Sequence, residues 1–386
     1  ELRYSRRVRV VGGLILFLGG VLNMGIFLKF DGIFLTETIG LSPDLLVFVM
    51  IAMLVVVVSY TVLGGMFSVV ITDFAQFVVL AIGMLVATVS IFFHLDLGDI
   101  AQAVVRAYGS EGVDPTVNSR FGWLFIVWML IASITTSALW QPAASKSLAS
   151  ENPEAGRKVF LYTGLTLAGR YMVPMFWGVA ALAMFGPDLT PSIAMPRLLG
   201  VVVPSGFLGL MVAGMLAASM STYSAYMLAW SSVATRDIIE AGRGRPLGER
   251  TSILLTRVIA TLIGCFLLVF GLLYEIPATA FQYIALTGAM YSAGALGCVA
   301  AGLYWKKANI VGAYAALIFG AVAPLTFLVL EKMQDTLPRW MLFLVDVNIS
   351  GLLSFVLAVS GMVAGSLLTQ RSHPPVSLAD LEHQRT

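Results

Sequence analysis

Residues 206–238 read GFLGLMVAGMLAASMSTYSAYMLAWSSVATRDI, and this stretch decides the class of fold. It contains no charged side chain before Arg236. About 20 apolar residues are enough to cross the roughly 30 Å hydrocarbon core of a bilayer as a helix. The stretch is therefore predicted to form a transmembrane helix.

Similar apolar runs recur along the chain of 386 residues. The composition is 59% hydrophobic and 11% charged, with a mean hydropathy of +0.91, whereas soluble domains carry about 25% charged residues. Because unpaired backbone groups are costly in lipid, runs of this length must be helical. We expect an all-α polytopic membrane protein with about ten transmembrane helices, at residues 9–37, 43–64, 69–93, 120–142, 158–185, 206–238, 252–273, 280–304, 309–330 and 345–369.

The placement of Lys and Arg predicts the orientation of these helices, since both residues are enriched in cytoplasmic loops. If the helices alternate in direction, both termini share one side with most of the basic residues, including Arg6, Arg157 and Lys306. We expect a multi-pass protein of the cell (inner or plasma) membrane with both termini cytoplasmic. Segments 94–119 and 186–205 are then external, and the prolines of the second predict a short helix over the outer mouth.

Several functional classes lack their signatures in this sequence. A net charge of +2 gives no general attraction for nucleic acid. The two cysteines lie in apolar segments without metal-ligand spacing, and HExxH, GxSxG and Walker A motifs are absent. We expect no catalytic residues, no transition metal, no cofactor and no nucleic-acid partner, so the protein is predicted not to be an enzyme.

The helix expected at 206–238 holds the most informative polar cluster. In an α-helix the carbonyl of residue i lies beside the side chains at i+3 and i+4, so the Ala218 carbonyl converges with the hydroxyls of Ser221 and Thr222. Uncharged oxygens of this kind suit a hard monovalent cation. The alternative is that these small residues only allow close helix packing.

Polar residues also open the helix expected at 69–93, where Thr72, Asp73 and Gln76 share one face. A carboxylate at this position would attract cations that leave toward the cytoplasm. Equally, an acidic residue in the first turn of a helix is stabilised by the helix macrodipole. The sequence leaves both interpretations of Asp73 open.

A polar stripe runs along the helix expected at 120–142, formed by Ser133, Thr136, Ser137 and Gln141 and followed by Pro142. Transporters bind solutes near the bilayer midplane beside interrupted helices, so the stripe is a candidate substrate site. Hydrogen bonding between helices is the alternative interpretation.

Charged residues in two of the expected transmembrane helices raise the question of their depth in the bilayer. Arg170 is about twelve residues into its helix, hence roughly 18 Å along it and close to the midplane. It would meet an anionic solute or an internal carboxylate, or else loose backbone carbonyls. Lys29 and Asp31 are placed near the outer surface by counting from residue 9, and we expect both to snorkel there.

Three blocks of sequence resemble the sodium:solute symporter family, whose members transport solutes such as sugars, proline, sialic acid and carboxylates. They are YTVLGGM at 60–66 running into TDFAQ at 72–76, AASMST at 217–222 running on to TRDI at 235–238, and GLYWKK at 302–307. In order and spacing together these blocks are specific. The resemblance covers nearly the whole chain up to about residue 370.

This resemblance implies a LeuT-like inverted-repeat helix bundle that lacks its first helices. It further implies that Ala218, Ser221 and Thr222 bind sodium, that Asp73 lies on the sodium release path, and that the stripe beginning at Ser133 contacts the solute. The expected domains are 1–93 (last three helices of the first repeat), 94–119 (extracellular loop), 120–304 (second five-helix repeat), 305–370 (two peripheral helices) and 371–386 (cytoplasmic tail).

The function implied by the resemblance is sodium-coupled secondary active symport of a small organic solute, with Na⁺ as coupling ion and the solute, the ion and the lipid bilayer as partners. Two alternatives remain at this point. One is a solute-sensing membrane module of the same fold linked to a signalling kinase. The other is a non-functional truncated fragment.

Overall fold

The computed structural model describes residues 1–118, 121–148, 150–275 and 280–376, with the backbone alone at 63–72, 145–146 and 148. It is 85% helical and contains no strand within these described ranges. Ten helices in the same ranges are long and apolar enough to cross a membrane. The expected all-α polytopic membrane fold is therefore confirmed, while residues 377–386 of the predicted tail lie outside the described residues.

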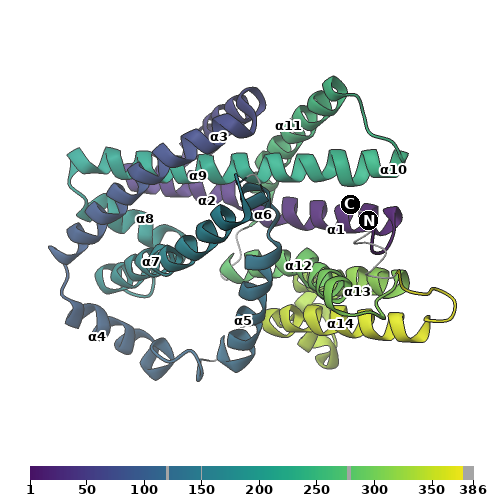
Figure 1. Ribbon diagram of the computed structural model, residues 1–386. Coiled ribbons are helices and arrows are strands. Elements are labelled where there is room, and N and C mark those ends of the chain that lie inside the picture. The colour runs from purple at the N-terminus through teal and green to yellow at the C-terminus, as the bar shows by residue number, and fades with distance from the viewer. Residues whose placement is uncertain (119–120, 149, 276–279, 377–386) are drawn as a thin grey trace.

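The helices follow one another along the chain with short connections (Figure 1). They are α1 Arg6–Met24, α2 Phe27–Ile39, α3 Leu46–Phe92, α4 Leu97–Tyr108, α5 Gly122–Leu139, α6 Gln141–Leu148, α7 Pro153–Phe185, α8 Pro191–Val202, α9 Ser205–Val233, α10 Ala241–Arg243, α11 Glu249–Leu273, α12 Ala280–Tyr304, α13 Ile310–Leu330 and α14 Val347–Leu368. A π-helical segment, Ala234–Glu240, joins α9 to α10, and 3₁₀ turns occupy Pro43–Leu45, Gly109–Gly112, Glu331–Thr336 and Arg339–Val345.

The first membrane span is broken at its middle, which the sequence pattern does not predict. Instead of one helix at 9–37, α1 ends at Met24 and α2 begins at Phe27. A Cβ on Gly25 would come within 2.8 Å of the Phe270 ring, so only glycine fits at the break. At the break the Leu22 carbonyl accepts hydrogen bonds from the Gly25 backbone N–H, at 3.1 Å, and from the Tyr283 hydroxyl of α12, at 3.0 Å.

The two helices expected at 43–64 and 69–93 form one continuous element, α3, in the structure. The separation expected near Gly64 and Gly65 falls on residues whose side chains are not described. The flanking parts, Pro43–Val62 and Asp73–Phe92, each qualify as a membrane span. Both halves also reach the same part of α9, since Tyr60 bonds to Met220 and Asp73 to Ser221.

The two segments predicted to be external each contain a helix. The short helix expected in 186–205 is α8, which begins at Pro191 and buries Leu198 and Leu199. The segment 94–119 contains α4, an amphipathic helix that the sequence pattern does not predict, with Ile100 and Val104 buried.

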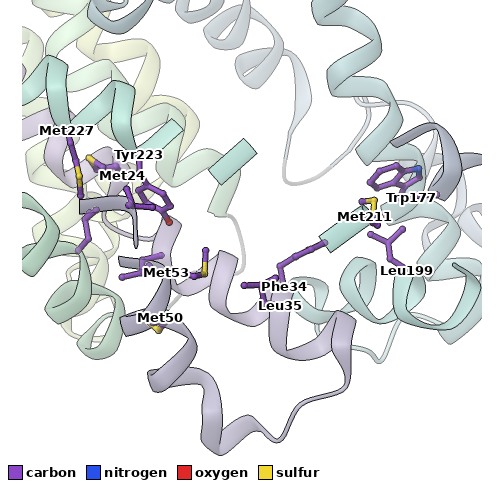
Figure 2. Packing of buried hydrophobic residues seen from close by; sticks show 14 of the residues in the cluster. Met24, Phe34, Leu35, Met50, Met53, Trp177, Leu199, Met211, Tyr223 and Met227 are labelled. Atoms are coloured by element: carbon purple, nitrogen blue, oxygen red, sulfur yellow. The ribbon is translucent and has the colours of Figure 1, made fainter. Parts of the chain in front are cut away.

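The main hydrophobic core lies among α1, α2, α3, α7, α8, α9 and α11. Figure 2 shows Tyr223, Met24 and Met227 at one end of it, and Trp177 with Met211 at the other. A second group, α12, α13 and α14, packs against α1 and α5 (Figure 1). α12 and α13 pack backbone to backbone, because a Cβ on Gly320 would come within 2.8 Å of the Gly294 nitrogen.

The two ends of the described chain meet beside α1 (Figure 1). The Arg3 guanidinium donates hydrogen bonds to the carbonyls of Gly302 and Trp305, both at 3.1 Å, and to that of Val376. The amino-terminal segment, the end of α12 and the segment after α14 therefore lie on one side of the molecule.

Candidate functional site

The polar cluster on α9 has the local geometry that its spacing predicts. The Thr222 hydroxyl donates to the Ala218 carbonyl at 2.9 Å, so these two oxygens are neighbours. The helix presents them half-buried rather than enclosed. Uncharged oxygens at this spacing are suitable ligands for an alkali cation.

The third residue of the predicted set, Ser221, contacts the predicted release residue directly. Its hydroxyl donates to Oδ1 of Asp73 at 2.5 Å. The contact forms because α3 and α9 cross closely: a Cβ on Gly214 would come within 3.1 Å of the Leu80 Cα atom. A carboxylate thus lies beside the uncharged oxygens of α9, so that the two predicted parts of the ion path form one cluster.

A second carboxylate reaches α9 from another side, and sequence reasoning missed it. The Tyr223 hydroxyl donates to Oδ2 of Asp31 at 2.7 Å, and Ser219, one helical turn earlier on α9, lies near the same carboxylate. Asp31 lies eight residues before the end of the span Arg6–Ile39, hence about 12 Å inside it at 1.5 Å per residue. The expected snorkelling of Asp31 is therefore wrong: its carboxylate turns inward to α9.

Lys29, two residues earlier, behaves differently from Asp31. Its ammonium group donates to the Tyr274 carbonyl, at 2.7 Å, just after the end of α11. Residues two apart on a helix point in different directions, so the two charges do not meet. The sequence does hint at the position of Asp31. Phe27 and Asp31 are four residues apart, so they share one face of α2, and the apolar Phe27 on that face indicates that it points inward.

The stripe on α5 is only partly gathered in one place. Ser133 and Ser137 line an open depression of 650 Å³ with Ile134, Ala138 and Phe160 of α7. Thr136 is half-buried and Gln141 begins α6, so neither lines the depression. The predicted interruption is present one residue before Gln141, where Trp140 has extended backbone angles between α5 and α6.

Arg170 lies on an exposed stretch of α7, among neighbours that are also exposed. The helix continues without a break through Pro174. Arg170 does not line the depression on α5, and ten residues separate it from Phe160, or about 15 Å along the helix. The structure therefore does not bring it together with the other predicted solute contacts.

An aromatic group surrounds the break between α5 and α6, and it too was missed. The Trp140 ring lies 5.1 Å from that of Tyr226, 5.8 Å from Trp230 and 5.6 Å from Tyr291. Tyr226 in turn lies 5.7 Å from Phe27 of α2. Tyr223, Tyr226 and Trp230 follow helical spacing, which in the sequence cannot be told apart from ordinary core packing.

Comparison with known proteins matches this chain to sodium:solute symporters. The model of the sodium:solute symporter family matches residues 157–320. A sodium/mannose cotransporter of Bos taurus is 26% identical over 376 residues, covering 84% of this chain and 61% of the relative. A sodium/sialic acid symporter of Aliivibrio fischeri is 24% identical over 266 residues, covering 65% of this chain and 51% of the relative.

The fold also matches a solved structure, that of a sodium-coupled sialic acid symporter in a substrate-bound outward-open state. The TM-score is 0.74 at 18% sequence identity, and the match covers 98% of this chain and 77% of the solved one. The mannose and sialic acid transporters described above are longer than this chain, which spans between half and two thirds of their length.

Proposed function

We propose that the chain, which is similar to the sodium:solute symporter family over residues 157–320 and to sodium-coupled members of it, acts in sodium-coupled secondary active symport of a small organic solute across the plasma membrane. The relatives that it matches are sodium-coupled transporters and not enzymes. The observation that carries the proposal is the pair of contacts at neighbouring positions of α9, in which the Thr222 hydroxyl bonds to the Ala218 carbonyl and the Ser221 hydroxyl bonds to the Asp73 carboxylate.

Sodium binds first in this proposal. The Ala218 carbonyl and the two hydroxyls supply ligand oxygens, and Asp73 attracts the ion on its way out. Binding of Na⁺ favours a conformation only to the extent that its affinity differs between conformations. Rocking of one group of helices against the other then exposes the ion and the solute to the cytoplasm in turn.

The arrangement of the chain in the membrane belongs to the same proposal. Both termini are cytoplasmic, supported by the distribution of basic residues and by the contacts of Arg3 that bring both ends to one side. Residues 1–93 belong to the first inverted repeat and 120–304 to the second, with 94–119 external, 305–370 peripheral and 371–386 a cytoplasmic tail.

We assign the solute contacts to the stripe on α5 and α6. Ser133 and Ser137 line the depression beside α7, and Thr136 and Gln141 belong to the same stripe. Arg170, which lies apart from this group on an exposed part of α7, is not included in the assignment. One relative is named for mannose and the other for sialic acid, so the names of the relatives do not identify the solute of this protein.

Uptake by the protein in proteoliposomes tests the proposal. An inward sodium gradient is expected to drive accumulation of the transported solute, whereas a potassium gradient is not. The double variant Ser221→Ala plus Thr222→Ala is expected to abolish the sodium dependence. Ser231→Ala is the matched control, since the Ser231 hydroxyl bonds only to carbonyls of its own helix. Sodium dependence that survives in the double variant refutes the ion site.

A further inference from the structure

Asp31 is an acidic residue within a membrane span that has no ion-pair partner among the described residues. The nearest basic residue in the chain, Lys29, donates to the Tyr274 carbonyl instead. Arg197 of the neighbouring helix α8 pairs with Glu37 at 3.1 Å. A carboxylate held in this way carries a negative charge for which the surrounding helices provide no counter-charge.

Intramembrane carboxylates are costly and are commonly part of a functional site. The hydroxyls of Tyr223 and Ser219 stabilise the charge of Asp31 but do not neutralise it. Asp31 and Ser219 are partly accessible, whereas Tyr223 is buried to 2% exposure. The site therefore consists of a carboxylate that the Tyr223 hydroxyl fixes in place at an intermediate level of burial.

Aromatic rings lie close to this carboxylate and to the tyrosine that holds it. Phe27 precedes Asp31 by four residues and lies on the same face of α2. Its ring is 6.5 Å from that of Tyr223 and 5.7 Å from that of Tyr226, in edge-to-face contact. Trp140 continues the group at 5.1 Å from Tyr226. Phe27, Tyr226 and Trp140 are each only partly buried.

The combination of one carboxylate with several aromatic rings favours one class of cation. An alkali ion needs a shell of several oxygens, and here only two hydroxyls accompany the carboxylate. An ammonium group is instead recognised by one anionic acceptor together with ring faces, through hydrogen bonding and cation–π attraction. The ligand chemistry that fits is an amine or a quaternary ammonium.

The position of this group connects it to transport. Tyr223 directly follows the candidate sodium ligand Thr222 on α9, and Trp140 forms the break that follows the α5 stripe. We propose that Asp31, with Ser219 and the rings of Phe27, Tyr226 and Trp140, binds an ammonium group on the transported solute. This inference rests on the proposed symport and narrows its solute to compounds that carry a positive nitrogen.

Ligand-induced thermal stabilisation of the purified protein in sodium buffer tests the inference. The ammonium probes are choline, L-proline and L-lysine, and the probes without an ammonium group are D-mannose and pantothenate. At least one ammonium probe is expected to raise Tm, with half-saturation at least tenfold weaker in Asp31→Asn. Tyr223→Phe keeps the ring and removes the donor, and is expected to weaken binding by a smaller factor. Glu37→Gln is the matched control, because it removes an acidic charge from the same helix outside the proposed site.

The inference is overturned if none of the ammonium probes stabilises the protein, or if Asp31→Asn binds them as the unaltered protein does. If Asp31→Asn lowers Tm in the absence of any ligand, Asp31→Glu provides the test, since it restores the charge and is expected to recover binding at least in part. Stabilisation by Na⁺ alone, lost in Ser221→Ala plus Thr222→Ala, reports on the symport itself. Retained sodium stabilisation without ammonium binding thus refutes only the solute class, whereas loss of both refutes the proposed function.

Discussion

Asp73 and Asp31 contact α9 two residues apart, at Ser221 and Tyr223, but they come from different helices and have different surroundings. Asp73 approaches from α3, where the two helices cross so closely that Gly214 touches the Leu80 backbone. Asp31 approaches from α2 among aromatic rings. The first carboxylate lies beside hydroxyls suited to a small ion, and the second beside surfaces suited to an organic cation. One helix can therefore serve both ligands of a symporter.

The largest effect is expected from Asp73→Ala. The substitution removes the acceptor of the Ser221 hydroxyl and the negative charge beside the proposed ion site. Hydrogen bonds to charged groups contribute about 1.5–3 kcal/mol, which corresponds to roughly a 10- to 100-fold change in affinity. We expect the sodium concentration for half-maximal uptake to rise by about this factor. An unchanged sodium dependence would contradict the assignment of Asp73 to the ion path.

A stability change is expected from Gly214→Ala, which tests the crossing of α3 and α9. The added Cβ would lie 3.1 Å from the Leu80 Cα atom and 3.3 Å from the Val79 carbonyl, both of them backbone atoms. Overpacking of this kind costs about 1–3 kcal/mol, so a lower Tm is expected together with weaker sodium binding. Gly209→Ala on the same helix is the control, because its Cβ would meet nothing within 4 Å.

A smaller and more selective effect is expected from Tyr223→Phe. The ring stays in the core, and only the hydrogen bond to Asp31 is lost. Because the charge of Asp31 remains, the half-saturation for the solute is expected to weaken by less than in Asp31→Asn, by roughly three- to tenfold. Sodium dependence is expected to change less than in Asp73→Ala, which a paired measurement of solute and sodium titrations will reveal. Equal effects on both titrations would show that the two carboxylates act as one site.

The smallest effect is expected from Ser137→Ala on α5. Ser137 is exposed and lines the open depression beside Phe160. A single exposed hydroxyl contributes about 0.5–1.5 kcal/mol to binding when it is bonded to a neutral group, so solute affinity should fall by about two- to tenfold. Initial rates of uptake at graded solute concentration measure this change. No change in affinity would remove Ser137 from the solute site and leave the cluster around Asp31 as the stronger candidate.

The sequence predicts the fold well because length and hydrophobicity decide it. A run such as 206–238 has no stable arrangement in lipid other than a helix, and i+3 and i+4 neighbours on that helix follow from its geometry. The contact between Ala218 and Thr222 is of this local kind. The contact between Asp73 and Ser221 is not local, and only family resemblance placed both residues on one ion path.

Asp31 could not be placed correctly from the sequence because two assumptions failed together. Depth was counted from residue 9 along one straight helix, whereas the span continues to Ile39 and is interrupted at Gly25. The break depends on the Phe270 ring of α11, which is distant in sequence. Trp140 was missed for a similar reason, since its neighbours come from α9 and α12.

The break at Gly25 also has a mechanical consequence. Below it, α1 is fastened to α12 through Asn23, whose amide donates to the Ile284 carbonyl at 2.7 Å. Above it, α2 is fastened to α8 through Thr38, whose hydroxyl donates to the Pro196 carbonyl at 3.3 Å. A single crossing of the bilayer thus consists of two helices, each bonded to a different neighbour on its own side of the break. The Asp31 carboxylate lies on the second of them, so its position is set by the contacts of α2 and not by those of α1.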